Sequence, residues 1–184
     1  MWVTGGTAKG TRLKTLARRS IRPTTSVVRH AIFSLLENRA TDWRRVLDLY
    51  AGTGALGIEA LSRRAEWVDF VDHRKSCCDI IRTNLAKIEE LHRAHVYCCS
   101  ASRAIGFLSN HYDVVFLDPP YSDSSASNSL MSLAESDLLG DNATIVLCHG
   151  NRFPLEANYD GLHLVTQRRY GDTFIFIYHK EVQL

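Results

Sequence analysis

The stretch "VLDLYAGTGALG", residues 46–57, decides the fold. Its apolar start is typical of a short buried strand, and residues 55–65 have the pattern of a helix. Between them, Gly52, Gly54 and Gly57 follow the spacing G-x-G-x-x-G, which lets a strand–loop–helix backbone approach a ligand closely. Asp72 ends the next predicted strand, where a carboxylate can accept hydrogen bonds from both hydroxyls of a ribose.

The alternation of strands and helices continues along the chain. Strands are predicted over residues 45–50, 67–72, 95–100, 112–118 and 143–149, separated by helices over residues 55–65, 74–91, 102–110 and 126–139. Such alternation produces right-handed βαβ units and a parallel sheet. Residues 162–180 differ, because two strands flank a Gly171-Asp172 turn. We therefore predict an α/β, Rossmann-like fold with a seven-stranded, mostly parallel sheet and a C-terminal antiparallel hairpin.

The N-terminal part has its own pattern. Residues 2–15 are predicted to form a small β-hairpin around a glycine-rich turn. A helix is expected to follow, capped by Thr24 or Thr25, with apolar residues at helical spacing. We divide the chain into a basic N-terminal hairpin or arm, residues 1–23, and one α/β domain, residues 24–184.

The net charge of +2 conceals an asymmetry. Residues 1–45 contain ten basic and two acidic residues, a net charge of +8, so the remainder carries −6. A basic arm on an acidic body indicates a polyanion partner, with a solvated basic surface as the alternative. The predicted contacts with the phosphates of that polyanion are Lys9, Arg12, Lys14, Arg18, Arg19 and Arg22. Arg168, Arg169 and Tyr170 are weaker candidates for the same surface.

Several functional classes are disfavoured. The chain has no apolar run long enough to span a membrane and no secretory signal, so we expect a cytoplasmic protein. Its five cysteines show no C-x-x-C spacing, so we expect reduced thiols and no metal site.

The glycine loop fits either a nicotinamide enzyme or an S-adenosylmethionine (SAM) enzyme. Asp48 favours SAM, because it would repel a pyrophosphate but attract the positively charged amino-acid end of SAM. The alternative is that Asp48 only bonds loop amides. After the third strand, Ser100 and Ala101 are expected to contact adenine. The predicted cofactor-binding residues are Asp48, Tyr50, Ala51, Gly52, Thr53, Gly54, Asp72, His73, Ser100 and Ala101.

A second motif, "DPPY", follows the apolar run of residues 114–117. An exocyclic base amine is a poor nucleophile, because its lone pair is delocalised into the ring. Asp118 and the carbonyl of Pro119 can accept its two N–H groups and free that lone pair. The prolines, Pro119 and Pro120, stiffen the loop, and Tyr121 can stack on a base turned out of its helix. We predict Asp118, Pro119, Pro120 and Tyr121 as the catalytic residues.

The whole chain resembles the RsmD-like family of 16S rRNA guanine-N2 methyltransferases. The segments that carry this resemblance are "GGTAKGTRL", "IRPTTSVVRHAIFSLLEN", "VLDLYAGTGALGIEALSR", "FLDPPY" and "RRYGDT". The resemblance implies SAM as cofactor and a guanine N2 of small-subunit rRNA as target, either in free RNA or within an assembling 30S subunit. It also implies that the basic N-terminal hairpin engages RNA.

The chain departs from the family pattern in two places. Residues 26–30 read "SVVRH" where the family usually has Asp-Arg-Val-Arg-Glu, and His149 stands where a glutamate is usual. Two alternatives therefore stay open: an amino-methyltransferase acting on adenine or DNA, and a non-catalytic RNA-binding assembly factor. A role for His149 as a general base is a further, optional expectation.

Overall fold

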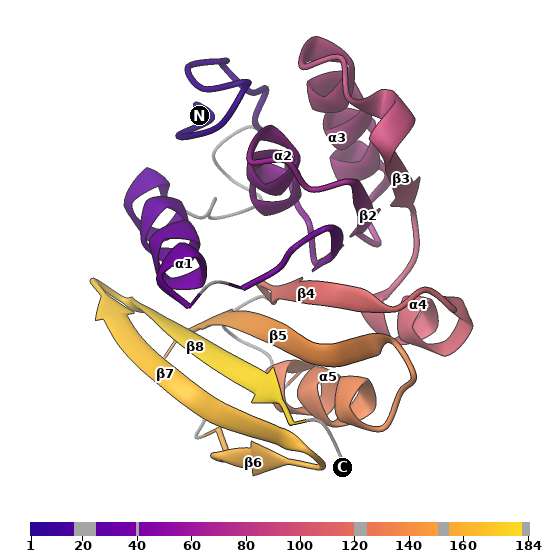
Figure 1. Cartoon of the computed structure of the whole chain (residues 1–184). Coiled ribbons are helices and arrows are strands. Elements are labelled where there is room, and N and C mark those ends of the chain that lie inside the picture. The colour runs from indigo at the N-terminus through magenta and orange to yellow at the C-terminus, as the bar shows by residue number, and fades with distance from the viewer. Residues whose placement is uncertain (17–24, 40, 120–124, 151–154, 182–184) are drawn as a thin grey trace.

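The computed structural model describes residues 1–16, 25–39, 41–119, 125–150 and 155–181. Five α-helices and eight strands are assigned within these residues (Figure 1). In chain order they are α1 (Ser26–Asn38), β1 (Arg45–Leu49), α2 (Ala55–Ser62), β2 (Trp67–Val71), α3 (Lys75–Lys87), a 3₁₀ turn (Leu91–Arg93), β3 (Ala94–Tyr97), α4 (Ala101–Phe107), β4 (Tyr112–Leu117), α5 (Ser125–Ala134), β5 (Leu139–His149), β6 (Asn158–Tyr159), β7 (Leu162–Tyr170) and β8 (Thr173–Lys180).

These strands form one sheet in the order β3-β2-β1-β4-β5-β8-β7-β6. Strands β1 to β5 run parallel, whereas β8 pairs antiparallel with both β5 and β7. Gly171 has a φ of 61° in the turn that joins β7 to β8. The predicted Rossmann-like fold with its terminal hairpin is confirmed. The sheet has eight strands instead of the predicted seven, because the two-residue strand β6 extends its edge beyond β7.

The boundary between α5 and β5 differs from the prediction. Helix α5 ends at Ala134 and β5 begins at Leu139, whereas a helix was expected to continue to residue 139. Leu138 and Leu139 are buried, and Tyr112 N–H donates to the Leu138 carbonyl at 2.8 Å. Apolar spacing alone could not distinguish a last helical turn from a strand start, and pairing with β4 decides for the strand.

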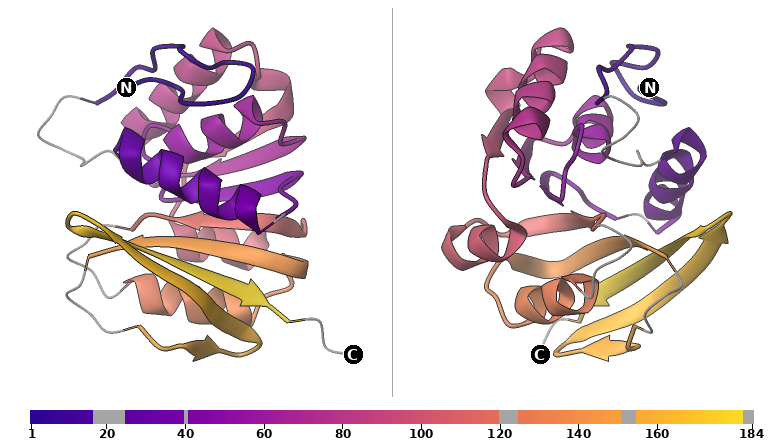
Figure 2. Two further views of the ribbon diagram at one scale, coloured as in Figure 1. Left: turned by 60° about the vertical axis from the view of Figure 1, so that its left-hand side comes forward. Right: turned by 180° about the vertical axis from the view of Figure 1, so that it is seen from behind.

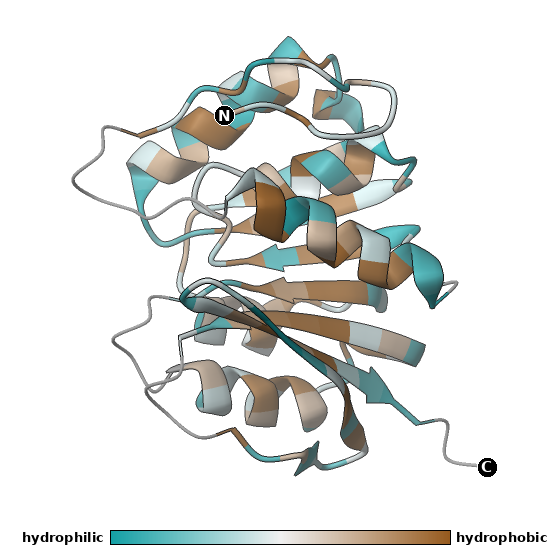
Figure 3. Ribbon diagram, turned by 90° about the vertical axis from the view of Figure 1, so that its left-hand side faces the viewer, coloured by the Kyte–Doolittle hydropathy of each residue, from teal (hydrophilic) through white to brown (hydrophobic). Residues whose placement is uncertain are grey.

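Alternation along the strands divides the core into two layers. Val46, Phe70 and Phe116 point to the face covered by α1, α2 and α3. The intervening residues, such as Leu47 and Leu117, point to the face covered by α4 and α5. Figure 2 shows helices on both faces, and Figure 3 shows that the central strands are mostly hydrophobic.

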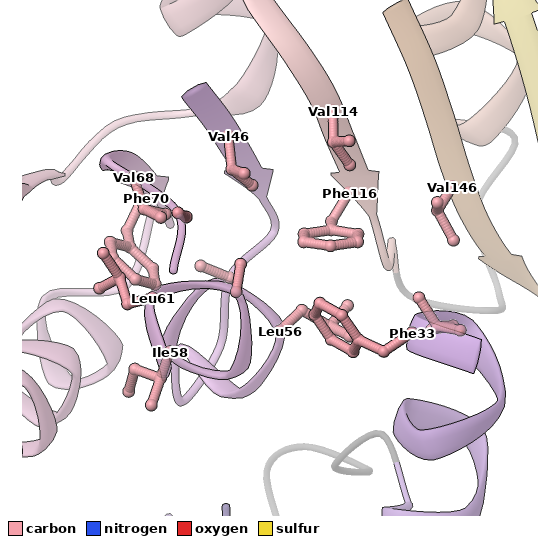
Figure 4. Close-up of a cluster of buried hydrophobic side chains, with 14 of the residues drawn as sticks. Phe33, Val46, Leu56, Ile58, Leu61, Val68, Phe70, Val114, Phe116 and Val146 are labelled. Atoms are coloured by element: carbon pink, nitrogen blue, oxygen red, sulfur yellow. The ribbon is translucent and has the colours of Figure 1, made fainter. Parts of the chain in front are cut away.

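Helix α1 packs against the first of these faces through its aromatic side chain. The ring of Phe33 lies 5.8 Å from that of Phe116, measured between centroids (Figure 4). The helix begins as predicted, because the Thr25 side chain caps it by accepting a hydrogen bond from Val28 N–H. Thr24, the other predicted cap, lies outside the described residues. Helix α1 is therefore part of the central core.

The N-terminal hairpin has an antiparallel bridge between Trp2 and Arg12. Val3 and Leu13 are each 3% exposed and join the core layer of α1, α2 and α3. Glu59 of α2 accepts hydrogen bonds from both the N–H and the hydroxyl of Thr4, at 2.8 and 2.7 Å. The hairpin is therefore packed firmly on the helices, while the division of the chain at residue 23 stays a prediction.

Gly57 permits the close approach of α2 to the sheet. A Cβ atom at this position would lie 2.3 Å from Phe70 Cε1 and 2.9 Å from Val68 Cγ1. Both contacts are shorter than any van der Waals separation, and both partners belong to a packed layer. The third glycine of the motif therefore acts through packing.

We expect Gly57→Ala to lower the free energy of unfolding by about 1–3 kcal/mol, because the added methyl group must displace a buried ring. Gly106→Ala on α4 is the matched control, since its Cβ would have no neighbour within 4 Å. That control should be neutral or stabilising by up to about 1 kcal/mol. Denaturant midpoints measure both effects, and equal midpoints for the two variants would contradict the packing argument.

Candidate functional site

The glycine loop between β1 and α2 is a tight turn at the carboxyl end of the sheet. Tyr50, Gly52 and Gly54 all have positive φ values, of 59°, 57° and 77°. Gly54 N–H donates to the Ala51 carbonyl at 2.7 Å, and Ala51 N–H donates to the Val71 carbonyl at 2.9 Å. Left-handed backbone at the two glycines costs little, whereas an L side chain there would be strained. The loop is thus held in a defined shape beside the end of β2.

Asp48 is buried beneath this loop, with only 2% of its surface exposed. Its Oδ2 accepts a hydrogen bond from Gly57 N–H at 2.9 Å. Burial is the main cause that raises the pKa of Asp48 to about 7; the charges of Asp118 and Asp72 act in the same direction, and the bond from Gly57 N–H opposes them. A cation bound nearby would favour the ionised carboxylate.

Strand register brings Asp118 to the same region. Leu117 of β4 lies opposite Leu49 of β1 and Leu147 of β5, so Asp118 and Cys148 follow at equivalent positions. Burial raises the pKa of Cys148 well above its usual value, and the charges of Asp118 and Asp48 add to this effect. The strand register and these mutual charge effects place the two carboxylates in the same region. Pro119 is buried and Asp118 is partly exposed. Pro120 and Tyr121, the other predicted catalytic residues, lie outside the described residues.

Asp72 links the ends of β1 and β2. Its Oδ2 accepts from Gly52 N–H at 2.9 Å, and its Oδ1 accepts from Arg74 N–H at 2.9 Å and from Arg74 Nε at 3.3 Å. His73, also predicted to bind cofactor, is exposed, with its Nδ1 3.9 Å from Asp72 Oδ1. Asp72 therefore fixes the loop and keeps its carboxylate at the edge of the same region.

The remaining predicted cofactor residues occupy different positions around the loop. The Tyr50 hydroxyl lies 2.9 Å from the Ser129 hydroxyl of α5. Thr53 is buried. The Ser100 side chain caps α4 by accepting from Arg103 N–H at 3.3 Å, and Ala101 is the buried first residue of that helix. Ser100 thus has a local structural role in addition to the predicted adenine contact.

Sequence reasoning missed Asn84 of α3. Its side-chain amide is fully buried and donates to the carbonyls of Thr53 and Lys14, at 3.1 and 3.0 Å. Its Oδ1 accepts from Lys14 N–H at 2.7 Å. The available signal was a polar residue on the apolar face of a predicted helix, between Ile81 and Leu85. Asn84 joins the glycine loop to the N-terminal hairpin.

The residues that depart from the family pattern fall into two environments. Ser26 and His30 are exposed on α1. His149 is 1% exposed at the end of β5, opposite Phe174 of β8. Its location beside the end of β4 keeps it near the candidate site.

The described residues show neither a metal-binding group nor a membrane-spanning helix. No group of three or more histidine, cysteine, aspartate or glutamate side chains among them is arranged to hold a metal ion. No helix within those residues has the length and apolar character required to cross a membrane.

Comparison with known proteins gives a consistent assignment. A family model described as "Conserved hypothetical protein 95" matches residues 1–179. Over 183 residues the chain is 36% identical to "Putative rRNA methyltransferase YlbH" of Bacillus subtilis (strain 168), covering 98% of this chain and 99% of that protein. The chain belongs to the RsmD-like methyltransferase family.

Other relatives agree with membership in the RsmD-like family. "Ribosomal RNA small subunit methyltransferase D" of Escherichia coli (strain K12) is 30% identical over 143 residues, covering 78% of this chain and 71% of that protein. A solved structure, "Putative methyltransferase yhhF from Escherichia coli", has a TM-score of 0.85 at 27% identity and covers 100% of this chain and 99% of its own. The similarity to this solved structure therefore is not restricted to one part of the chain.

The raised pKa of Asp48 predicts an unusual pH dependence of stability. The folded state binds the Asp48 proton more tightly than the unfolded state, so this group stabilises the protein most below its unfolded pKa. That contribution is lost as pH rises toward about 7. We expect Asp48→Asn to gain about 1–3 kcal/mol in free energy of unfolding, relative to the wild type, between pH 5 and pH 8.

Urea unfolding of the ligand-free protein at several pH values measures this trend. Asp79→Asn is the control, because the bond from Lys75 lowers the pKa of that exposed carboxyl and its titration falls below this range. Parallel stability curves for wild type and Asp48→Asn would show that Asp48 does not titrate between these pH values.

Proposed function

We propose that the protein is a SAM-dependent methyltransferase that modifies the exocyclic N2 amine of a guanine in small-subunit (16S) rRNA. The observation that carries the proposal is the convergence of Asp48, Asp72 and Asp118 at the carboxyl ends of three adjacent strands, around a glycine loop. Ligands of open α/β sheets bind at this edge. The names of the relatives support rRNA methylation, and the resemblance to the RsmD-like pattern supports guanine N2.

The acidic character of the region fits SAM as the cofactor. Asp48 is buried with a raised pKa, and its Oδ2 accepts a hydrogen bond from the backbone amide of Gly57, so a cationic ligand would relieve its unfavourable burial. A pyrophosphate would instead meet three carboxylates. Asp72 would hold the ribose, Gly52 and Gly54 would let the backbone approach, and Asp48 would face the amino-acid end. When bound, SAM supplies a methyl group on a positively charged sulfur, which departs as a neutral thioether.

The amine is activated by hydrogen bonding in this proposal. Asp118 Oδ accepts one N–H of the guanine amine, and the Pro119 carbonyl accepts the other. The nitrogen lone pair forms the new N–C bond, the C–S electron pair stays on sulfur, and the proton lost from nitrogen passes through Asp118 to water. The carboxylate stabilises the positive charge that develops on nitrogen. In the same proposal Pro120 stiffens the loop, and the ring of Tyr121 stacks on the target base.

The hairpin supports RNA as the substrate class. Lys9, Arg12 and Lys14 are all exposed, and the hairpin is anchored on α2 and α3. Basic side chains on a rigid support bind phosphates and position a nucleic acid without reading its sequence. Arg18, Arg19 and Arg22, also proposed as RNA contacts, lie outside the described residues.

Transfer from labelled SAM to three substrates tests the proposal: small subunits from a strain that lacks this protein, the naked rRNA of those subunits, and DNA. We expect label in N2-methylguanine of rRNA. Label in adenine or in DNA would show that the methylated group is another base amine and not guanine N2. RNA binding without any label would indicate a non-catalytic RNA-binding factor.

We expect Asp118→Ala to reduce methyl transfer at least 10²-fold, because preorganised electrostatic stabilisation of the developing charge is lost. SAM affinity, measured by calorimetry, should change little. Asp160→Ala removes an exposed acid in the turn between β6 and β7 and serves as control. Unchanged turnover in Asp118→Ala would remove this residue from the mechanism.

Replacing Lys9, Arg12 and Lys14 together with glutamine should weaken RNA binding. Each lost phosphate contact lowers the slope of log K against log salt by about 0.7–0.9. A matched control replaces Lys75, Arg82 and Arg103, three exposed basic residues of α3 and α4. If both triple variants changed the slope equally, net charge and not the hairpin would account for RNA binding.

A further inference from the structure

Trp2 is the most exposed large aromatic side chain in the described part of the chain, at 57%. Its exposure follows from the period of the strand. Val3 and Leu13 point inward and are 3% exposed, so their neighbours Trp2, Arg12 and Lys14 point outward. The outer face of the hairpin therefore carries one indole and two cations.

Trp2 and Arg12 form a cross-strand pair. They are the bridged residues of the hairpin, and the Arg12 guanidinium carbon lies 5.9 Å from the centroid of the indole ring. This is a cation–π distance. The pair places a positive charge beside a flat apolar surface that stays open to solvent.

The backbone of Trp2 is held by a buried guanidinium, whose burial has an unfavourable desolvation free energy. Arg29 of α1 is 1% exposed and donates from Nη2 to the Trp2 carbonyl at 2.7 Å. Burial lowers the pKa of Arg29, although the charge of Glu59 opposes this. Within the described part of the chain, Arg29 Nε and Nη1 have no hydrogen-bond partner. A buried guanidinium is thus committed to fixing the strand that carries Trp2.

The opposite strand of the hairpin is equally fixed. Lys87 of α3 donates to the Arg12 carbonyl, and Asn84 bonds both the N–H and the carbonyl of Lys14. A ring on such a support loses little conformational entropy when a ligand stacks on it. The exposed indole is therefore preorganised for binding.

The open end of the hairpin, where the N-terminus lies, is on the same side of the molecule as the candidate site. The left view of Figure 2 shows the N-terminus, the amino end of α1 and the turn between β7 and β8 along one side. That turn adjoins the carboxyl end of β5, because Phe174 pairs with His149. RNA presented to the site can therefore extend across the hairpin.

We propose that Trp2 is a stacking platform for an unpaired RNA base, with Arg12 and Lys14 binding the flanking phosphates. The proposal rests on the RNA substrate of the proposed function and adds a second base contact outside the catalytic loop. A flat indole next to guanidinium and ammonium groups matches the alternating base and phosphate of single-stranded RNA. A purely apolar protein partner would not match the adjacent cations.

Fluorescence titration with a short unstructured RNA of mixed sequence tests this contact, with the same RNA annealed to its complement as comparison. The other two tryptophans are half-buried and donate their indole N–H groups to Arg63 O and Asp69 Oδ1. We expect single-stranded RNA to quench the emission of Trp2, with weaker quenching by the duplex. Trp2→Phe, which keeps a ring, should lose the signal but retain most of the affinity.

Trp2→Ala should bind single-stranded RNA roughly 5- to 100-fold more weakly, with an unchanged salt slope because no charge is removed. Phe107→Ala, on the exposed face of α4 at 49%, is the matched control and should bind like the wild type. Thermal unfolding should change little and to a similar extent in both variants, because both side chains are about half exposed, 57% at Trp2 and 49% at Phe107.

Equal affinity of Trp2→Ala and the wild type for single-stranded RNA would overturn the stacking proposal, even if wild-type protein methylates rRNA. Equal losses for single-stranded and duplex RNA would overturn it as well. Absence of methyl transfer by the wild type would instead contradict the proposed function and leave the RNA-binding comparison interpretable on its own.

Discussion

A buried carboxylate at the end of the central strand is the constraint on which the rest of the site depends. The Asp48 side chain is almost completely buried. The hydrogen bond that it accepts from Gly57 N–H offsets only part of the hydration free energy that the carboxylate loses. Two further carboxylates act on it electrostatically, so its surroundings disfavour the charged form of Asp48. The loop, the helix start and the neighbouring strand ends are all arranged around this one group.

The geometry follows from two elementary periodicities. Because side chains alternate along a strand, Asp48 shares a face with Phe116 and Asp118 follows on that face. Parallel strands end at the same edge, which brings the acids of β1, β2 and β4 together without any long-range sequence signal. Gly57 then lets α2 lie directly on Phe70, which points the first turn of that helix at the same region.

Much of the fold could be predicted, because strand–helix alternation and turn chemistry are local. The glycine loop, the strand ends at Asp72 and Asp118, and the terminal hairpin all depend on nearby residues. The start of β5 could not be predicted, since the pairing of Leu139 with Tyr112 is a tertiary effect. The hydrogen bond between the hydroxyls of Tyr50 and Ser129 joins residues far apart in the sequence, and no local pattern predicts it.

Among the candidate site residues, those fixed by backbone geometry were easier to predict than those fixed by side-chain contacts. The spacing of Gly52, Gly54 and Gly57 reports directly on permitted φ values and on close packing. Cys148 and Asn84 acquire their surroundings only when distant strands and helices meet. A hydrophobic pattern predicts that Cys148 is buried and that Asn84 is a polar exception on an apolar face. It does not indicate which residues either one contacts.

The single side-chain amide of Asn84 spans two segments that serve different ligands in our proposal. It holds the carbonyl of Thr53 in the glycine loop and, through the same nitrogen, the carbonyl of Lys14 in the basic arm. A displacement of either segment must stretch a bond to the other. Occupancy at one end of this bridge should therefore alter affinity at the other end by a common factor, as thermodynamic reciprocity requires. Binding of the methyl donor and binding of the RNA would then be coupled. Each ligand would raise or lower the affinity for the other through one buried amide.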